Sequence, residues 1–187
     1  SNKPVKPAVD TPKRDRPAPD NWATYKTHGI QSQPMSTPEG RALVASYEKS
    51  GATRAQAIQR AHEVGKSGST LPKSLSVKKG DKLYKLVPQG EMPSAHSPYF
   101  ATKSDVDMLK GQSYDQLSDQ LGIPLESQQT SKFDIVEVEA LEDTQVFQST
   151  IAPTTQNGYS QPGGGTQTLI TNRNAFSTPK STGKTLP

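Results

Sequence analysis

The pattern of apolar positions is helical in the first part of the chain and strand-like in the rest. In the first part, apolar side chains recur three and four residues apart and form two narrow stripes. Thr37 followed by Pro38 predicts the start of a helix that ends at Gly51. Thr53 predicts the start of a second helix that ends at Gly65. Two narrow apolar stripes are typical of a helical hairpin that packs against a larger body.

In the rest of the chain, apolar and polar residues alternate with the two-residue period of β-strands. One helix interrupts the strands: Ser113 and Gln116 have the spacing of a capping box, and Gly122 ends that helix. These elements predict an α+β fold, in which a small, mostly antiparallel sheet with inserted helices follows a helical N-terminal segment. A short turn joins the third and fourth strands, and the fifth is expected to be the last. The expected strands are 81–87, 99–102, 133–141, 144–153 and 166–172.

The composition predicts one domain with a modest core. Of the 187 residues, 30% are hydrophobic and 16 are prolines. Residues 1–20 hold five of these prolines and almost nothing apolar, which predicts a disordered Pro-rich linker. Residues 21–70 then form a helical N-terminal or linker segment, and residues 71–187 form the main domain.

Composition and charge also exclude several classes of site. Cysteine is absent, which removes disulfides, thiolate metal sites and cysteine nucleophiles. No apolar run is long enough to cross a bilayer, so we expect no membrane insertion by this domain. The net charge of +4 is mildly basic, but no dense basic stripe with interleaved aromatic residues occurs. Nucleic acid is therefore not indicated as a partner.

Two patterns that suggest chemistry have simpler explanations. The stretch EVGKSGST (63–70) is similar to a phosphate-binding loop, but Arg60 stands where that motif needs a glycine, and no strand precedes it. The histidines His28, His62 and His96 are scattered without metal-ligand spacing, so we expect no metal site. His96 stays a candidate because it lies in a loop between two predicted strands.

A group of carboxylates lies near the end of one predicted strand. Glu137 and Glu139 share a face of that strand, and Glu142 and Asp143 follow it. Such a pair can act as general acid and base, or can simply lie on a solvated strand face. We favour the solvated face.

The stretch SQPGGGTQTLI (160–170) needs a physical explanation, because consecutive glycines cost backbone entropy and add nothing to a core. The glycines form either a loose turn or a place where another group comes very close to the backbone. Pro162 stiffens the entry to the loop, and Gln167 offers a donor and an acceptor at its rim. Successive amide N–H groups also predict a concavity for an anion or a carbonyl oxygen. We therefore treat the loop as a candidate ligand site.

The same stretch resembles the C-terminal signature of the tuberculosis necrotizing toxin family. In that family an Ile-Ala-Pro stretch leads to Gln-Pro-Gly-Gly-Gly-x-Gln and then to a strand, and this chain has both parts between Ile151 and Gln167. The resemblance implies an NAD-binding fold like that of the ADP-ribosyltransferases. It extends over about residues 80–175 and is strong only near residues 151–169.

The resemblance implies roles for residues on three strands. In such folds an early strand carries a basic residue that holds the diphosphate of NAD, which here is Lys85. A second strand carries a Ser/Thr-containing motif, here HSPYFAT, in which Tyr99 and Phe100 would flank the nicotinamide. A late strand carries Glu or Gln, here Gln167, which would bind a ribose hydroxyl. The implied catalytic residues are Gln167, Lys85 and His96, and the implied substrate-binding residues are Tyr84, Ser97, Tyr99, Phe100, Thr102, Gly163, Gly164 and Gly165.

By this resemblance the chain is expected to be a toxin effector domain that hydrolyses NAD to nicotinamide and ADP-ribose without a metal. An amide at the position where many transferases have glutamate favours water as the acceptor. The alternatives are a mono-ADP-ribosyltransferase, a ribonuclease toxin that uses His96 and Lys85, and a non-catalytic interaction module. The resemblance also implies secretion, delivery into the cytoplasm of a target cell, and a cognate immunity protein as partner.

Overall fold

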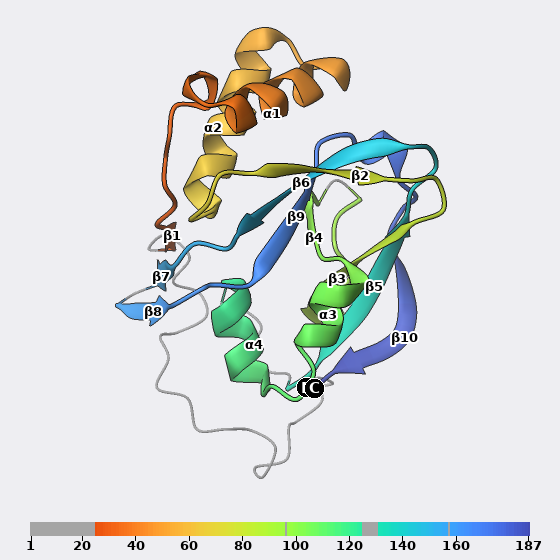
Figure 1. Cartoon of the computed structure of the whole chain (residues 1–187). Coiled ribbons are helices and arrows are strands. Elements are labelled where there is room, and N and C mark those ends of the chain that lie inside the picture. The colour runs from red at the N-terminus through yellow and green to blue at the C-terminus, as the bar shows by residue number, and fades with distance from the viewer. Residues whose placement is uncertain (1–24, 96, 125–130, 157) are drawn as a thin grey trace.

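Within the residues that can be placed, the chain folds as the α+β domain that the sequence predicts. Three small antiparallel sheets have helices packed around them (Figure 1). The predicted linker at 1–20 and the candidate His96 lie outside the described residues. The computed structural model describes residues 25–95, 97–124, 131–156 and 158–187.

The two helices predicted in the first part of the chain are present. Helix α1 is Pro38–Lys49 and helix α2 is Arg54–Ser67. The Thr37 hydroxyl accepts a hydrogen bond from Gly40 N at the start of α1, and Thr53 starts α2 within a capping box. Among the described residues, no helix combines the length and the apolar character needed to cross a membrane.

Helix α2 continues beyond Gly65, where the sequence predicts its end, to Ser67. Gly29 N donates to Lys66 O, and Gln31 N donates to Gly65 O, both at 3.0 Å. The chain before α1 therefore satisfies carbonyl groups in the last turn of α2. With those groups satisfied, the helix needs no glycine stop at the predicted position.

The strand pairs among the described residues are all antiparallel and form three sheets. The first sheet has the order β2–β6–β9–β4, the second has β10–β5–β3, and the third has β1–β7–β8. The strand bounds are β1 Lys26–Thr27, β2 Lys73–Val77, β3 Lys82–Pro88, β4 Tyr99–Phe100, β5 Phe133–Glu139, β6 Thr144–Thr150, β7 Thr154–Gln156, β8 Tyr159–Gln161, β9 Thr166–Ile170 and β10 Lys180–Leu186.

Several strand predictions differ from the structure. Strand β4 stops at Phe100 because Thr102 caps a helix, α3 (Lys103–Met108), that is missing from the prediction. The strand predicted to be the last, 166–172, is followed by β10, whose polar sequence KSTGKTL hides its period. Strands β1, β2, β7 and β8 are also missing from the prediction. Strand β2 is exposed at four of its five residues, and β7 and β8 have three residues each.

Strands β5 and β6 follow one another along the chain but belong to different sheets. A short turn joins them as predicted, but they do not pair, because the chain between Glu139 and Thr144 crosses from the second sheet to the first. Ala140 N donates to Asp81 O, and Gly80 N donates to Ala140 O, both at 2.8 Å. These bonds fix the position of the crossing.

Three clusters of buried apolar side chains hold the elements together. Helices α1 and α2 pack on the first sheet, where Phe147 and Leu169 contact their apolar stripes. Side chains of the first and second sheets meet in another cluster. Helices α3 and α4 (Tyr114–Leu121) pack on the second sheet, where the ring of Phe133 stacks on Tyr114 with centroids 4.2 Å apart. This packing places α3, α4 and the end of α2 around one region of the sheets (Figure 1).

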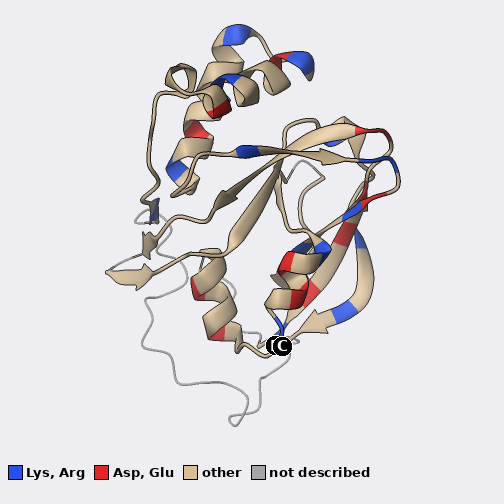
Figure 2. Ribbon diagram, viewed as in Figure 1, with Lys and Arg blue, Asp and Glu red and all other residues tan. Residues whose placement is uncertain are grey.

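The surface charges of the described residues are mixed rather than separated. Basic and acidic residues both occur along α1, α2 and α3 (Figure 2). Lys103 and Lys110, for example, both pair with Asp107, at 3.0 and 3.1 Å. Exposed pairs of this kind contribute little stability, so the fold depends on the apolar clusters.

Candidate active site

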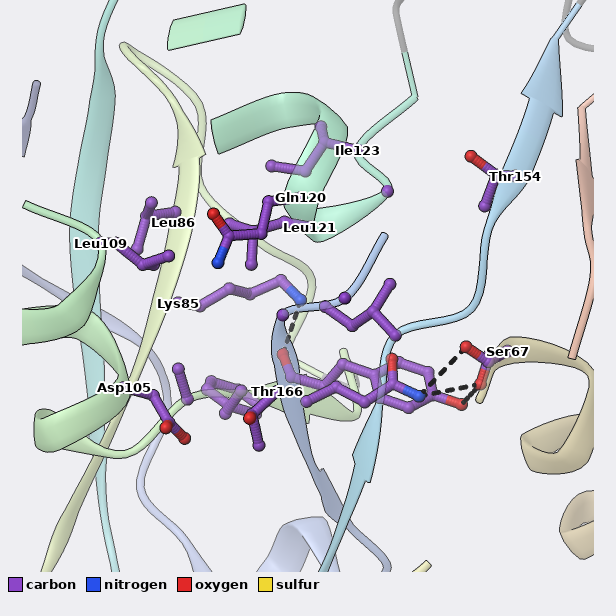
Figure 3. Close-up of a pocket in the computed structure, with 18 of the residues that line it drawn as sticks. Ser67, Lys85, Leu86, Asp105, Leu109, Gln120, Leu121, Ile123, Thr154 and Thr166 are labelled. Atoms are coloured by element: carbon purple, nitrogen blue, oxygen red, sulfur yellow. Dashed lines mark hydrogen bonds between the residues drawn. The ribbon is translucent and has the colours of Figure 1, made fainter. Parts of the chain in front are cut away.

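Strands β3, β4 and β9 and helices α3 and α4 surround a cavity of ≈ 540 Å³ (Figure 3). Gly164, Gly165 and the C-terminal end of α2 complete its wall. Such a volume lies within the range of small-molecule sites. Among the described residues that line the cavity, only Lys85 and Asp105 carry a charge. The cavity is therefore the candidate active site.

The cavity brings together residues that lie far apart in the sequence. Ser97, Thr102 and Gly163 do not line it, and His96 lies outside the described residues. The Thr102 hydroxyl instead accepts a hydrogen bond from Asp105 N at 3.2 Å, at the start of α3. The residues singled out from the sequence that do line the cavity are Tyr84, Lys85, Tyr99, Phe100, Gly164, Gly165 and Gln167.

Gln167 lies on β9 and is only 7% exposed. Its Nε2 donates to Ser67 O at 3.3 Å, to Ser67 Oγ at 3.2 Å and to Ser149 Oγ at 3.1 Å. Because a carbonyl oxygen can only accept, the contact with Ser67 O fixes which end of the amide is the nitrogen. No described residue donates to Oε1. The amide oxygen therefore remains as an acceptor for a ligand in the cavity.

Lys85 reaches the cavity from β3. Its Nζ donates to Tyr99 O at 2.7 Å and lies 5.5 Å from the centre of the Phe100 ring. Burial disfavours the charged ammonium and lowers the pKa of Lys85 from 10.5 to about 8. It forms no ion pair with a described carboxylate. A buried ammonium without a carboxylate partner is suited to binding an anionic ligand.

Tyr99 and Phe100 are adjacent on β4, so their side chains leave opposite faces of the strand. Tyr99 packs beside the helix cluster, and its hydroxyl lies 2.8 Å from Ser67 Oγ. Burial raises the pKa of the Tyr99 hydroxyl, which keeps it neutral. Phe100 is 4% exposed and lies in the cluster between the sheets, with Arg173 Cζ 5.4 Å from its ring centre. The resemblance implies that these two rings hold one nicotinamide between them. Rings that lie in different clusters are not arranged to do so.

The glycine loop is packed against the backbone of the protein itself. The amide N–H groups of all three glycines donate to backbone carbonyl groups, at distances between 2.9 and 3.1 Å. The interpretation of these amides as a concavity for an anion is therefore wrong. A Cβ on Gly163 would lie 2.5 Å from Ile151 O, so the group that approaches the loop closely is the chain's own backbone. The acceptors of Gly163, Gly164 and Gly165 are Asp119 O, Ile151 O and Gln120 O.

Gln161, the first residue of the Gln-Pro-Gly-Gly-Gly motif, is a buried structural anchor. Its Oε1 accepts hydrogen bonds from Thr154 Oγ1 at 2.8 Å and Gln156 Nε2 at 3.0 Å. Its Nε2 donates to Ile123 O at 2.9 Å, just beyond α4. A buried amide with satisfied ends joins the β7–β8 hairpin to the end of α4, and so positions the glycine loop beside the cavity.

The cavity wall also contains Ser67 and Asp105, which the sequence analysis does not identify. Ser67 ends α2 and contacts both Gln167 and Tyr99, so the N-terminal helical segment contributes to the site. No local pattern indicates this contact, because Ser67 and Gln167 are 100 positions apart. For Asp105 the sequence does contain a local signal, because this residue stands three positions after Thr102, at capping-box spacing.

The carboxylates at the end of β5 lie away from the cavity. Lys82 and Lys180 approach Glu137 at 3.3 and 3.8 Å, and Glu137 is only 9% exposed. The favoured interpretation as a solvated face is therefore wrong for Glu137. Neither Glu137 nor Glu139 lines the cavity. Across the described part of the chain, no three His, Asp or Glu side chains converge as metal ligands would.

Comparisons with known proteins find similarity only among solved structures. No protein-family model matches the chain, and no curated protein matches it. One similar structure is Rhs1-CT in complex with its cognate immunity protein RhsI1, at 22% identity and a TM-score of 0.44, over 64% of this chain and 83% of that one. Another is Tse6 in complex with Tsi6, at 14% identity and a TM-score of 0.46, over 81% of this chain and 98% of that one.

Proposed function

We propose that this chain is the effector domain of a secreted toxin that hydrolyses NAD in the cytoplasm of a target cell. The observation that carries the proposal is the single cavity that Lys85, Tyr99 and Gln167 line together. The resemblance selects these residues from three separate strands on the basis of the sequence alone. Their meeting in one cavity of suitable volume is what a functional resemblance requires.

The proposed reaction breaks the bond between N1 of nicotinamide and C1′ of the ribose. Nicotinamide leaves as a neutral molecule with the bonding electron pair, a water oxygen bonds to C1′, and that water loses a proton to solvent. Such a reaction passes through an oxocarbenium-like state. Positioning and electrostatic stabilisation therefore matter more than acid catalysis.

The two polar residues have separate roles in the proposed complex. Oε1 of Gln167 accepts a hydrogen bond from a hydroxyl of the nicotinamide ribose, since its nitrogen is occupied by Ser67 and Ser149. The amide cannot act as a base, which favours water over a macromolecular nucleophile as the acceptor. Lys85 holds the diphosphate as a point charge.

Nicotinamide release from NAD tests the proposal. The purified chain is incubated with NAD, with and without cell lysate, and free nicotinamide and ADP-ribose are measured. Hydrolysis predicts release of both in equal amounts without lysate. Nicotinamide release that requires lysate would indicate an ADP-ribosyltransferase. No release in either case, with degradation of added RNA, would indicate a ribonuclease.

We expect the activity on NAD to fall as the pH rises through the pKa of Lys85, at about 8. Below that pH the ammonium is charged and binds the diphosphate, and above it the neutral amine does not. The value of kcat/KM should therefore decrease by up to about tenfold per pH unit above pH 8, mainly through KM. Initial rates measured between pH 6.5 and 9.5 check this.

Lys85→Arg is the matched control, because a guanidinium stays charged over this range. Its pH profile should be flat, whatever its absolute rate. The free energy of unfolding should rise over the pH range in which the activity of the wild type falls. The folded pKa of Lys85 lies below the unfolded value of 10.5, so the unfolded chain binds more protons and stability rises between about pH 8 and 10.5. A decline in kcat/KM that persists in Lys85→Arg would contradict the assignment.

We also propose a cognate immunity protein that covers the cavity. The net charge of +4 favours an acidic partner surface. Such a partner should stop nicotinamide release when mixed with the chain in equal amounts. A cognate partner that binds tightly and leaves the rate unchanged would contradict this placement.

A further inference from the structure

We propose that Asp105 binds the ribose in the adenosine half of NAD and makes the site prefer NAD to NADP. This inference rests on the function proposed above. It concerns the second charged residue of the cavity wall, to which the resemblance gives no role.

The carboxylate of Asp105 forms no hydrogen bond or ion pair with a described residue. Asp105 lies in the first turn of α3 and lines the cavity. Its Oδ2 is shielded from solvent and has no hydrogen-bond partner among the described residues. Asp105 and Lys85 share the cavity wall without forming an ion pair. A buried carboxylate oxygen without a partner is costly, and its retention points to a ligand.

The comparison with two other helices shows that this carboxylate is not used as a cap. In α2 and α4 the third helical residue returns its side chain to the N–H of the cap residue: Gln56 does so at 3.0 Å and Gln116 at 2.9 Å. Asp105 has the same position in α3, where its own N–H bonds to the Thr102 hydroxyl at 3.2 Å. Its carboxylate does not return to Thr102 N. The carboxylate therefore takes no part in capping α3, and Asp105 lines the cavity.

The position of Asp105 matches the third group along the dinucleotide. Figure 3 shows Ser67 and Asp105 on opposite sides of the view, with Lys85 between them. In the proposed complex, the nicotinamide ribose lies by Gln167, which contacts Ser67, and the diphosphate lies by Lys85. The adenosine ribose comes next and falls at the Asp105 end of the cavity.

The chemistry of a carboxylate fits an unphosphorylated ribose. The 2′- and 3′-hydroxyls both donate to carboxylate oxygens, as they do to acidic residues in other dinucleotide sites. NADP carries a phosphate on the 2′-oxygen, which removes one donor and brings negative charge against Asp105. The lysines of α3 and the turn after it do not offset this charge, because Lys103 and Lys110 pair with Asp107. Asp105 therefore disfavours NADP.

The test compares the wild-type chain, Asp105→Asn and Glu142→Gln with three substrates: NAD, NADP and nicotinamide mononucleotide, which lacks adenosine. For the wild type, kcat/KM should be roughly tenfold or more higher for NAD than for NADP, as expected for hydrogen bonds to a charged group. Asp105→Asn should lose most of this preference and keep its rate on the mononucleotide. Glu142→Gln removes an exposed carboxylate that does not line the cavity and should keep the wild-type ratio.

Three outcomes would overturn the inference. The first is an unchanged ratio of kcat/KM for NAD to kcat/KM for NADP in Asp105→Asn. The second is a rate on the mononucleotide that falls in Asp105→Asn as much as the rate on NAD. A melting temperature several degrees lower, with the ratio kept, would assign Asp105 a structural role. Equilibrium dialysis with ADP-ribose and its 2′-phosphate separates this inference from the proposed function. Suppose that the wild type releases no nicotinamide. Tighter binding of ADP-ribose than of its 2′-phosphate, lost in Asp105→Asn, would still support the role of Asp105. Equal binding of the two compounds by the wild type would overturn that role.

Discussion

Gln167→Ala is expected to lower the turnover of NAD by roughly 100-fold or more, the effect of losing one preorganised transition-state hydrogen bond. The loss should appear in kcat, because the ribose hydroxyl is held most tightly when charge develops at C1′. Turnover measured at saturating NAD, with circular dichroism to confirm the fold, checks the expectation. A rate within about fivefold of the wild type would place Gln167 outside the catalytic site.

The structural role of Gln167 has to be separated from its chemical role. Its Nε2 joins β9 to Ser67 at the end of α2 and to Ser149 on β6, so alanine also removes these contacts. Ser149→Ala removes one of these contacts without changing the cavity wall, and should lower turnover far less than Gln167→Ala. Gln167→Glu keeps an acceptor oxygen but cannot donate to Ser67 O, so its turnover should lie between the wild type and alanine.

The parts of the fold that the sequence predicts are those with local signals. Thr37, Thr53 and Ser113 each cap a helix, because a side-chain oxygen and a backbone N–H three residues later are close in any helix start. Strand β10 has no such signal. Its polar residues pair with β5 through backbone hydrogen bonds, which the side-chain pattern does not encode.

The candidate site is only partly predictable for the same reason. Lys85 and Gln167 follow from strand positions in a motif, and both line the cavity. Ser67 does not, since its contact with Gln167 depends on how α2 packs on the first sheet. The sequence predicts a ligand for the glycine amides because the carbonyl groups that accept from them come from distant residues, such as Asp119. Side-chain type is visible in a sequence, but the supply of backbone partners is not.

The Gln-Pro-Gly-Gly-Gly-x-Gln motif therefore divides into a structural half and a half that faces the cavity. Gln161 and Gly163 bond to neighbouring backbone and do not line the cavity. Gly164, Gly165 and Gln167 line the cavity. A motif with two functions predicts that substitutions only one position apart give different defects.

Gly163→Ala should accordingly destabilise the fold, and Gly164→Val should remove activity from a folded protein. Gly163 has φ +67°, and a Cβ there would lie 2.5 Å from Ile151 O and 2.6 Å from Ala152 O. Strain and overlap with rigid backbone should cost roughly 3 kcal/mol, or about 6–12 °C in melting temperature for a chain of this size.

Gly164 has φ +99° but nothing within 4 Å of its Cβ position, so Gly164→Ala should cost only about 1–2 kcal/mol. The larger Gly164→Val side chain then occupies the space beside the cavity and should abolish nicotinamide release. Equal melting temperatures for Gly163→Ala and Gly164→Ala, or normal turnover by folded Gly164→Val, would mean that the loop is not divided in this way.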